Sequence, residues 1–269
     1  TEKSVQAALQ PGSLCPHSNG ARHHCRAQQE HGKTLHSVVH KMNVMFGCKK
    51  IVALLSHSGS RGLGAAIAKH YSLLAREVCK LPREAQHFAW LSLNSEEGQE
   101  YWMSMNLAGD YARACHERIH LNLSKALGLK PVANVNNHHN FAWKEEIAPG
   151  RMAIVHRKGA TPAQKGQAGL IPGSMATPGY LVCGKGVEES LCSASHGAGR
   201  AMSRQKAKES FTQSALKKML SQADVTLIGG SIEEMPLAYK DIDRVMYTQE
   251  TLVEVQGRFM PRIVRMNKE

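Results

Sequence analysis

Short apolar segments separated by polar turns recur along most of the chain, and their spacing predicts a mixture of helices and strands. The β-branched run at residues 51–55 is typical of a buried strand. Residues 62–79 and 100–129 place apolar side chains at helical spacing, and residues 204–221 predict a basic amphipathic helix. Further strands are expected at residues 130–136, 152–155, 170–171, 180–183, 225–228 and 252–255. This mixture predicts an α/β or α+β fold with mixed sheets and surrounding helices.

The longest helical pattern, at residues 100–129, is expected to bury one apolar stripe against the rest of the protein. Gly109 is a point at which this helix could be interrupted. The residues expected to form much of the stripe are Trp102, Met105, Leu107, Tyr111, Ala114 and Ile119.

The first 34 residues differ from the rest of the chain. Residues 10–34 are rich in Pro, Gly, His, Cys, Gln and Arg and have no apolar periodicity, so we expect residues 1–34 to form an irregular or divergent segment. Residues 35–269 are expected to form the folded part of the chain, with enough residues to bury a sizeable core. The spacing of Cys15, His17, His23, His24 and Cys25 matches no standard zinc finger, so no structural metal is expected there.

Composition and charge narrow the possible classes of protein. Residues 1–10 are polar, and no run approaches the roughly 20 apolar residues that cross a bilayer, so we expect a cytoplasmic protein. The seven cysteines are odd in number and irregular in spacing, which predicts reduced thiols. The net charge of +12 favours a polyanionic partner, while only 5% aromatic residues argue against stacking-based binding of single strands. Contacts with RNA should therefore be mainly with phosphates.

Four polar loops at predicted strand ends carry a histidine beside small or basic residues. The first, at residues 57–64, combines His57 with Arg61, whose planar fork suits phosphate oxygens. In the second, at residues 136–141, adjacent histidines on an extended segment point to opposite sides. We expect His139 to face a site and His138 to lie in a polar surface turn.

The other two loops add cations and a candidate nucleophile. Residues 156–162 begin with His156, Arg157 and Lys158, three potential cations before a glycine turn. Residues 193–200 place His196 and Arg200 among small residues, and a neutral imidazole can attack phosphorus where cations stabilise the developing charge. Together the four loops predict metal-assisted chemistry on phosphate esters. They do not separate a ligase from a phosphohydrolase.

In family order, these loops resemble the RtcB RNA ligases. The matching strings begin at His57, His139, His156, Ile171 and His196, and a sixth, at residues 234–240, resembles the C-terminal signature of the family. The resemblance covers about residues 35–265 and implies an RtcB-like fold. It also implies a GTP- and Mn²⁺-dependent ligase that joins RNA 3′-phosphate or 2′,3′-cyclic phosphate ends to 5′-hydroxyl ends, in RNA repair or tRNA splicing.

The resemblance also implies residue roles. His196 would be the nucleophile that carries GMP, and His57 and His139 would be metal ligands in a centre that holds two Mn²⁺ ions. Phosphate and RNA binding would fall to Arg61, Arg157, Lys158 and Arg200. The implied GTP-binding residues are Asn140, Pro172, Gly173, Ser174, Met175, His196, Gly197, Ala198, Gly199 and Tyr239.

The chain departs from the family pattern in its metal ligands. An upstream Asp–Gly–Cys–Gly element and an Asn–His–Phe motif, which supply further ligands in the family, have no counterpart here. We therefore expect an incomplete second metal site. The alternative hypothesis is an inactive or fragmentary homologue that binds nucleotide or RNA ends without catalysis; a phosphohydrolase ranks behind both, because the His196 string matches a nucleotidylated histidine.

Overall fold

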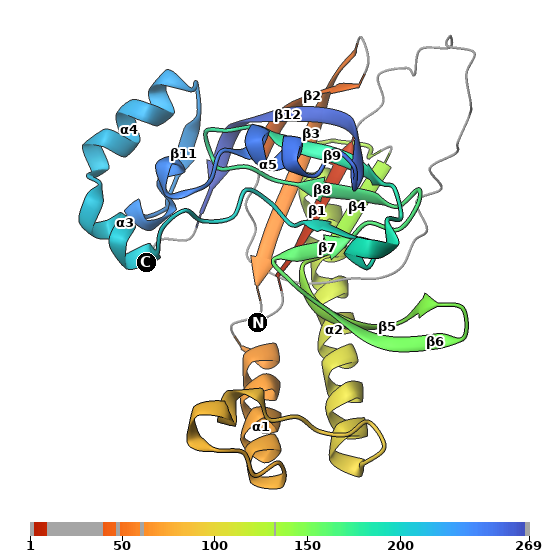
Figure 1. Ribbon diagram of the computed structural model, residues 1–269. Helices are drawn as coiled ribbons and strands as arrows, with labels where there is room; N and C mark the ends of the chain where they lie inside the picture. Colours follow the sequence, from red (N-terminus) through yellow and green to blue (C-terminus); the bar gives the residue numbers. More distant parts are fainter. Residues whose placement is uncertain (1–2, 10–39, 47–48, 60–61, 132, 267–269) are drawn as a thin grey trace.

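The computed structural model describes residues 3–9, 40–46, 49–59, 62–131 and 133–266. In this part of the chain an eight-stranded sheet forms the centre of the molecule (Figure 1). Its strands are β1 (Lys3–Leu9), β2 (His40–Phe46), β3 (Lys49–Gly59), β4 (Ala133–His138), β8 (Ala168–Ile171), β9 (Gly179–Gly184), β11 (Thr226–Ile228) and β12 (Val253–Arg265). Helices pack around this sheet, so the fold is mixed α/β, as predicted.

The strand order is β4-β1-β3-β2-β12-β9-β8, and β11 pairs with β12 off this path. Neighbours along the path are antiparallel, whereas β11 and β12 are parallel. Two small antiparallel pairs lie beside the main sheet: the hairpin of β5 (Asn140–Ala148) with β6 (Arg151–Lys158), and β7 (Ala160–Pro162) with β10 (Ser193–Ser195).

The strand β1 places part of residues 1–34 in the main sheet. It pairs with β3 on one side and with β4 on the other, both antiparallel. The prediction of an irregular segment is therefore wrong for Lys3–Leu9, because non-local pairing and not local periodicity makes this strand. The Pro- and Gly-rich residues 10–34, with the five candidate zinc ligands, lie outside the described residues.

The helices are α1 (Leu63–Val78), α2 (Glu96–Ala126), α3 (Arg204–Ser210), α4 (Gln213–Gln222) and α5 (Ile242–Thr248), with short 3₁₀ turns η1 (Arg83–Phe88), η2 (Glu188–Ser190), η3 (Ile232–Glu234) and η4 (Pro236–Ala238). The helix predicted at residues 204–221 is broken in two. Phe211 and Thr212 are extended, and the Thr212 hydroxyl accepts a hydrogen bond from the Ala215 amide, which caps α4.

The helix α2 runs through Gly109 without interruption but buries a different face from the predicted stripe. Its side chains at Leu107 and Tyr111 are 69% and 60% exposed. The buried face instead repeats every four residues and consists of Ala108, Ala112, His116, His120 and Ser124. The N-terminal half of α2 projects from the sheet together with α1, and only its C-terminal half reaches the strands (Figure 1). A helix that meets a sheet over half its length needs small and polar residues there more than a long apolar stripe.

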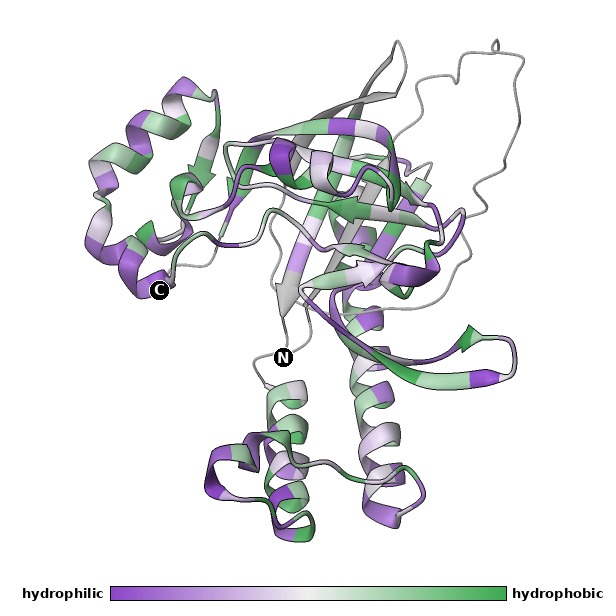
Figure 2. Ribbon diagram, in the orientation of Figure 1, coloured by the Kyte–Doolittle hydropathy of each residue, from purple (hydrophilic) through white to green (hydrophobic). Residues whose placement is uncertain are grey.

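Buried apolar side chains form three clusters around the sheet. One cluster joins β3, β4, β8 and β9 to Phe259 of β12, and a second lies between β9 and α5. The third joins α4 and β11 to Met175 and Val264. Figure 2 shows the hydrophobic colour on β8 and β9, whereas α4 alternates between hydrophobic and hydrophilic residues.

The described residues bear on the last strand, on the helices and on the cysteines. The strand predicted at residues 252–255 extends from Val253 to Arg265. None of the helices that the structure describes is long and apolar enough to span a membrane. Of the seven cysteines, the described Cys79, Cys115, Cys183 and Cys192 carry free thiols.

Candidate functional site

Three histidines from separate parts of the chain come together at one end of the main sheet. The ring centroids of His57 and His139 are 5.4 Å apart, and those of His139 and His196 are 4.7 Å apart. His139 is only 4% exposed, between the other two rings. We call His57, His139 and His196 the histidine cluster. All three were predicted as site residues from separate loops, and the fold joins them.

The register of β1 explains how two of these histidines meet. In the pairing of β1 with β3, Val5 lies opposite His57, and in its pairing with β4 the same residue lies opposite Asn137. Because β3 and β4 are both antiparallel to β1, they run in the same direction and end at the same edge of the sheet. His57 near the end of β3 and His139 just after β4 therefore reach the same place.

The adjacent histidines His138 and His139 point to opposite sides, as predicted. The ring of His138 contacts Phe141, with centroids 5.6 Å apart, while His139 faces the histidine cluster. The expectation of a surface turn for His138 is wrong, because this residue ends β4 and its Nδ1 atom is buried. Burial lowers the pKa of His138 to about 4.

His196 is held by the backbone of Gly159. Its Nδ1 lies 2.7 Å from the Gly159 carbonyl oxygen, which also accepts a hydrogen bond of 3.3 Å from the His196 amide. A carbonyl oxygen only accepts, so Nδ1 carries the proton and the lone pair of the neutral ring is on Nε2. Gly159 has φ +75°, and its own amide donates to the His139 carbonyl, so one glycine fixes two members of the histidine cluster.

The loop after His196 packs tightly on the loop that begins at Pro172. The Ala198 amide donates a 3.0 Å hydrogen bond to the Pro172 carbonyl oxygen. A Cβ atom added to Gly197 would lie 2.9 Å from that same oxygen, closer than real contacts allow. The two loops predicted to bind the nucleotide are therefore neighbours, and Gly197 permits their approach.

The residues 172–175 contribute backbone more than side chains to this region. The Ser174 hydroxyl is 2.8 Å from that of Thr177, which also accepts a hydrogen bond from the Ser174 amide, so the turn is closed on itself. Met175 is 4% exposed and packs in the cluster with Leu216 and Met235. Its side chain belongs to the hydrophobic core, while Pro172 borders the loop of His196.

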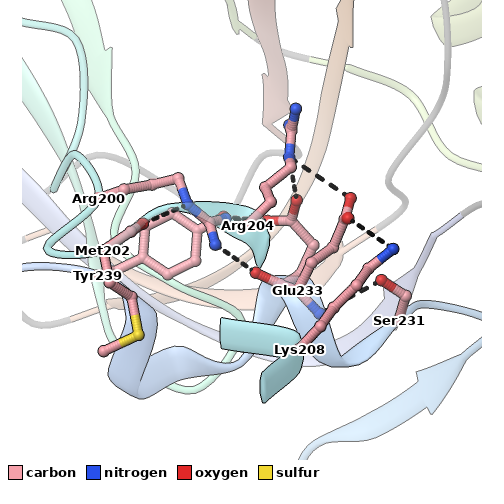
Figure 3. Close-up of polar contacts among 8 residues, drawn as sticks. Arg200, Met202, Arg204, Lys208, Ser231, Glu233 and Tyr239 are labelled. Atoms are coloured by element: carbon pink, nitrogen blue, oxygen red, sulfur yellow. Dashed lines mark hydrogen bonds and ion pairs between the residues drawn. The ribbon is translucent and has the colours of Figure 1, made fainter. Parts of the chain in front are cut away.

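Arg200 contacts Met202, the η3 residues Glu233 and Glu234, and Tyr239 (Figure 3). Its guanidinium donates to the carbonyl oxygens of Met202 and Glu233 at 3.1 and 2.5 Å, and lies 3.4 Å from the Glu234 carboxylate. It also lies over the ring of Tyr239, 5.1 Å from the centroid. The Arg200 side chain is 23% exposed, and protein groups occupy most of its donors.

The Tyr239 hydroxyl donates to Glu234, and burial together with this carboxylate raises the pKa of Tyr239 well above its usual range. Figure 3 also shows Arg204 and Lys208 of α3, whose charged groups contact the carboxylates of Glu233 and Glu234. Lys208 lies 3.2 Å from Glu233, and Arg204 contacts both carboxylates at 3.4 and 3.5 Å. The hydroxyl of Tyr239 is therefore occupied by Glu234. Only its ring could contact a nucleotide in the predicted GTP-binding role.

Arg157 is not placed to bind phosphate. It is 2% exposed, and its guanidinium makes two hydrogen bonds of 2.8 and 2.7 Å with the Glu145 carboxylate. Further donors reach the Ser193 hydroxyl and the Leu191 carbonyl oxygen, both at 2.8 Å, and the group lies over the Trp143 ring. The prediction of a phosphate-binding role for Arg157 is therefore not supported.

The neighbours of Arg157 behave differently because side chains alternate along a strand. His156 and Lys158 are exposed on the opposite face of β6, so two of the three predicted cations face solvent. Asn140 begins β5 and pairs with Lys158, which places both at the end of the hairpin nearest the histidine cluster. Arg61 lies outside the described residues.

The imidazoles of His57 and His139 suit a transition-metal ion, and by ligand type alone they favour Zn²⁺ over Mn²⁺, whose preferred ligands are oxygens. Among the residues that the structure describes, no group of three or more His, Cys, Asp or Glu side chains could hold a metal ion. A centre at these two histidines would therefore need oxygen ligands from a bound phosphate, from water or from other protein groups.

The structure reveals two histidines that the sequence analysis did not single out. His116 and His120 of α2 are 0% and 4% exposed, and both face the hydroxyl of Ser56 on β3. Burial lowers the pKa of His116 to about 3, helped by neighbouring histidines, and that of His120 to about 4. The sequence feature that could have indicated them is the repeat of small and polar residues every four positions in α2. The larger apolar residues of the same helix led the prediction to another face.

Known proteins resemble this chain over most of its length. The family described as tRNA-splicing ligase RtcB matches residues 27–267. The RNA-splicing ligase RtcB of Escherichia coli strain K12 is 35% identical over 240 residues, which are 84% of this chain and 59% of that protein. The tRNA-splicing ligases RtcB of Nanoarchaeum equitans and Methanococcus maripaludis are each 33% identical, over 79% and 72% of this chain. The chain spans about half the length of these two relatives, 52% and 48%.

Proposed function

Since the chain belongs to the RtcB family of tRNA-splicing ligases, we propose that it acts in joining RNA ends through a covalent histidine–GMP intermediate. The observation that carries this proposal is the tautomer of His196. Its Nδ1 donates to the Gly159 carbonyl oxygen, so the lone pair on Nε2 is the nucleophile. The family match indicates the class of reaction, and the hydrogen bond at Nδ1 leaves Nε2 as the reacting atom.

In the proposed first step, Nε2 of His196 attacks the α-phosphorus of GTP. A phosphorus–nitrogen bond forms and pyrophosphate leaves with the electrons of the broken phosphorus–oxygen bond. The positive charge on the imidazole is stabilised at Nδ1–H by the Gly159 carbonyl dipole. An oxygen of the RNA 3′-phosphate then takes the guanylyl group from His196, and the RNA 5′-hydroxyl displaces GMP to close the strand.

His57 and His139 would hold one Mn²⁺ ion of a pair. When bound, the metal supplies positive charge to phosphate oxygens. The buried position of His139 between the other two rings would bring that charge next to the nucleophile. The two imidazoles leave coordination positions for phosphate oxygens, which suits an ion that binds substrate as well as protein.

The recognition of nucleotide and RNA falls to the surrounding loops in this proposal. Lys158 is exposed at the end of β6, and with Arg61 it would contact phosphates of GTP or of RNA ends. The ring of Tyr239, over which Arg200 lies, would border the guanine base beside the loop of Pro172. The net charge of +12 supports an RNA partner, because neutralising phosphates releases counterions.

Labelling of the chain with GTP tests the proposal. The protein is incubated with α-³²P-GTP and Mn²⁺, denatured, and the label retained on the polypeptide is measured. Wild-type protein should acquire label that His196→Ala loses entirely. The matched control is His70→Ala, which removes an exposed imidazole from α1, a helix that contributes no residue to the histidine cluster. Label that persists in His196→Ala, or that falls equally in both variants, would contradict the assignment.

A second candidate function is binding of nucleotide or RNA ends without catalysis. It is favoured by the absence of a group of three or more metal-ligating side chains among the described residues. This alternative predicts GTP or RNA binding in a filter assay without any covalent label. The two measurements on one preparation therefore separate the candidates.

A further inference from the structure

A serine hydroxyl and two histidines form a buried polar contact where α2 meets the main sheet. The Ser56 Oγ atom lies 2.7 Å from Nε2 of His120 and 3.4 Å from Nδ1 of His116. All three residues are nearly or fully buried, with exposed fractions of 1%, 4% and 0%. We call His116 and His120 the imidazole pair. One turn of α2 separates them, so both rings reach the same point on β3.

The chemistry of this contact favours hydrogen bonding over metal binding. A serine hydroxyl has one proton to donate and lone pairs to accept, so it can donate to one ring nitrogen and accept from the other. The short distance to His120 makes this the stronger of the two bonds. Both nitrogens thus converge on an atom that satisfies them, and the rings stay neutral in their buried position. The pair is built to hold the hydroxyl.

Strand geometry connects Ser56 to the histidine cluster. Successive side chains on a strand point to opposite faces, so Ser56 faces α2 while His57 faces His139. The same alternation occurs at the end of β4, where His138 and His139 diverge. On both strands, the residue before the predicted metal ligand turns away from the histidine cluster. Anchoring the first residue of each pair fixes the direction of the second.

We propose that the imidazole pair positions His57 for metal binding, acting through Ser56. This inference rests on the proposed function, which makes His57 a ligand. The imidazole pair lies in the C-terminal half of α2, and the small buried residues Ala108 and Ala112 continue the face of the helix that carries it. The pair touches neither substrate nor metal in this proposal. It holds the end of β3 so that the His57 ring meets that of His139.

The expected size of the effect follows from related arrangements. Removing a group that orients a metal-binding histidine typically weakens metal affinity or activity by about 10- to 100-fold. Here the support acts through the strand backbone and not directly on the ring, so we expect the lower end, about 10-fold. The affinity for GTP should change much less, because the guanylate-pocket residues Pro172 and Tyr239 lie on other elements.

Three single variants, one double variant and one control test the inference in the full chain. Ser56→Ala removes the hydroxyl, His120→Leu removes the stronger bond, and His120→Gln retains a polar group of similar reach. The control Ser124→Ala removes a buried hydroxyl one turn further along the same face of α2, where Oγ has no hydrogen-bond partner among the described residues. Circular dichroism and melting temperature establish that each variant is folded.

Two readouts are measured on each variant. The first is the Mn²⁺ dissociation constant from electron paramagnetic resonance of free Mn²⁺, together with the rate and the GTP dependence of covalent labelling. The second requires no metal or GTP: the rate at which diethylpyrocarbonate modifies His57, followed by mass spectrometry. The second readout reports the placement of His57 even if the chain forms no GMP adduct.

The inference predicts that Ser56→Ala and His120→Leu weaken Mn²⁺ binding about 10-fold and change the modification rate of His57 several-fold. His120→Gln should recover part of both effects, and Ser124→Ala should resemble wild type. The double variant of Ser56→Ala with His120→Leu should be no worse than Ser56→Ala alone, since loss of the hydroxyl already removes its contact with His120. A folded Ser56→Ala protein with wild-type modification of His57 overturns the inference. Wild-type protein without labelling overturns the proposed function instead, and the modification of His57 then decides the inference alone.

Discussion

The replacement Arg157→Met tests whether this guanidinium is a structural support or a phosphate ligand. The Arg157 side chain is 1% exposed, and that of Glu145 is 20% exposed. Loss of the arginine leaves the Glu145 carboxylate without its bidentate partner, and also removes the hydrogen bonds to Ser193 and Leu191. Breaking a buried ion pair in this way costs about 3–5 kcal/mol.

Partial exposure of Glu145 lets water compensate some of this loss, so we expect about 3 kcal/mol. For a chain of this size that corresponds to a fall in melting temperature of roughly 6–12 °C. Urea unfolding followed by circular dichroism gives the free energy directly. Adding Glu145→Gln to Arg157→Met should recover roughly 1–2 kcal/mol, because the unpaired carboxylate is then removed.

Lys158→Met is the matched control, since its side chain is exposed on the opposite face of β6. It should change the free energy of unfolding by less than about 0.5 kcal/mol, as surface substitutions usually do. Its effect should fall on binding of RNA ends in a filter assay. If Arg157→Met has the wild-type free energy of unfolding but weakens RNA binding as much as Lys158→Met, the structural role assigned to Arg157 is refuted.

Two further perturbations follow from buried groups and close contacts. Burial holds the pKa of His116 at about 3 and that of His120 at about 4, below the value of 6.5 for an exposed histidine, so the unfolded chain binds more protons between these values. Stability is then fully present above pH 6.5 and falls as the pH drops towards 4, by up to about 1.4 kcal/mol per histidine per pH unit; urea unfolding at pH 7.5 and 5.5 measures it, and an unchanged slope in His120→Gln would count against the assignment. Gly197→Ala forces a Cβ to within 2.9 Å of the Pro172 carbonyl oxygen and should cost about 1–3 kcal/mol and slow GMP labelling of His196. A Gly197→Ala protein that unfolds and is labelled like wild type would show that the contact is unimportant.

Local patterns in the sequence determined much of this protein. The strand at residues 51–55 and the helix at residues 62–79 follow from apolar spacing and glycine, and both are present as β3 and α1. The strings at His57, His139 and His196 carried the family resemblance. Their residue types and their order along the chain can be read without knowing the fold. The opposite directions of His138 and His139 likewise follow from strand geometry alone.

Only the tertiary structure decided which side of each element is buried and what meets there. The histidine cluster exists because β1 pairs with β3 and β4, and those pairings join residues far apart in sequence. Arg157 and Lys158 are adjacent cations, yet one pairs with Glu145 inside the protein and the other faces solvent. Periodicity gives the spacing of side chains but not the partner of each face, which depends on contacts between distant segments.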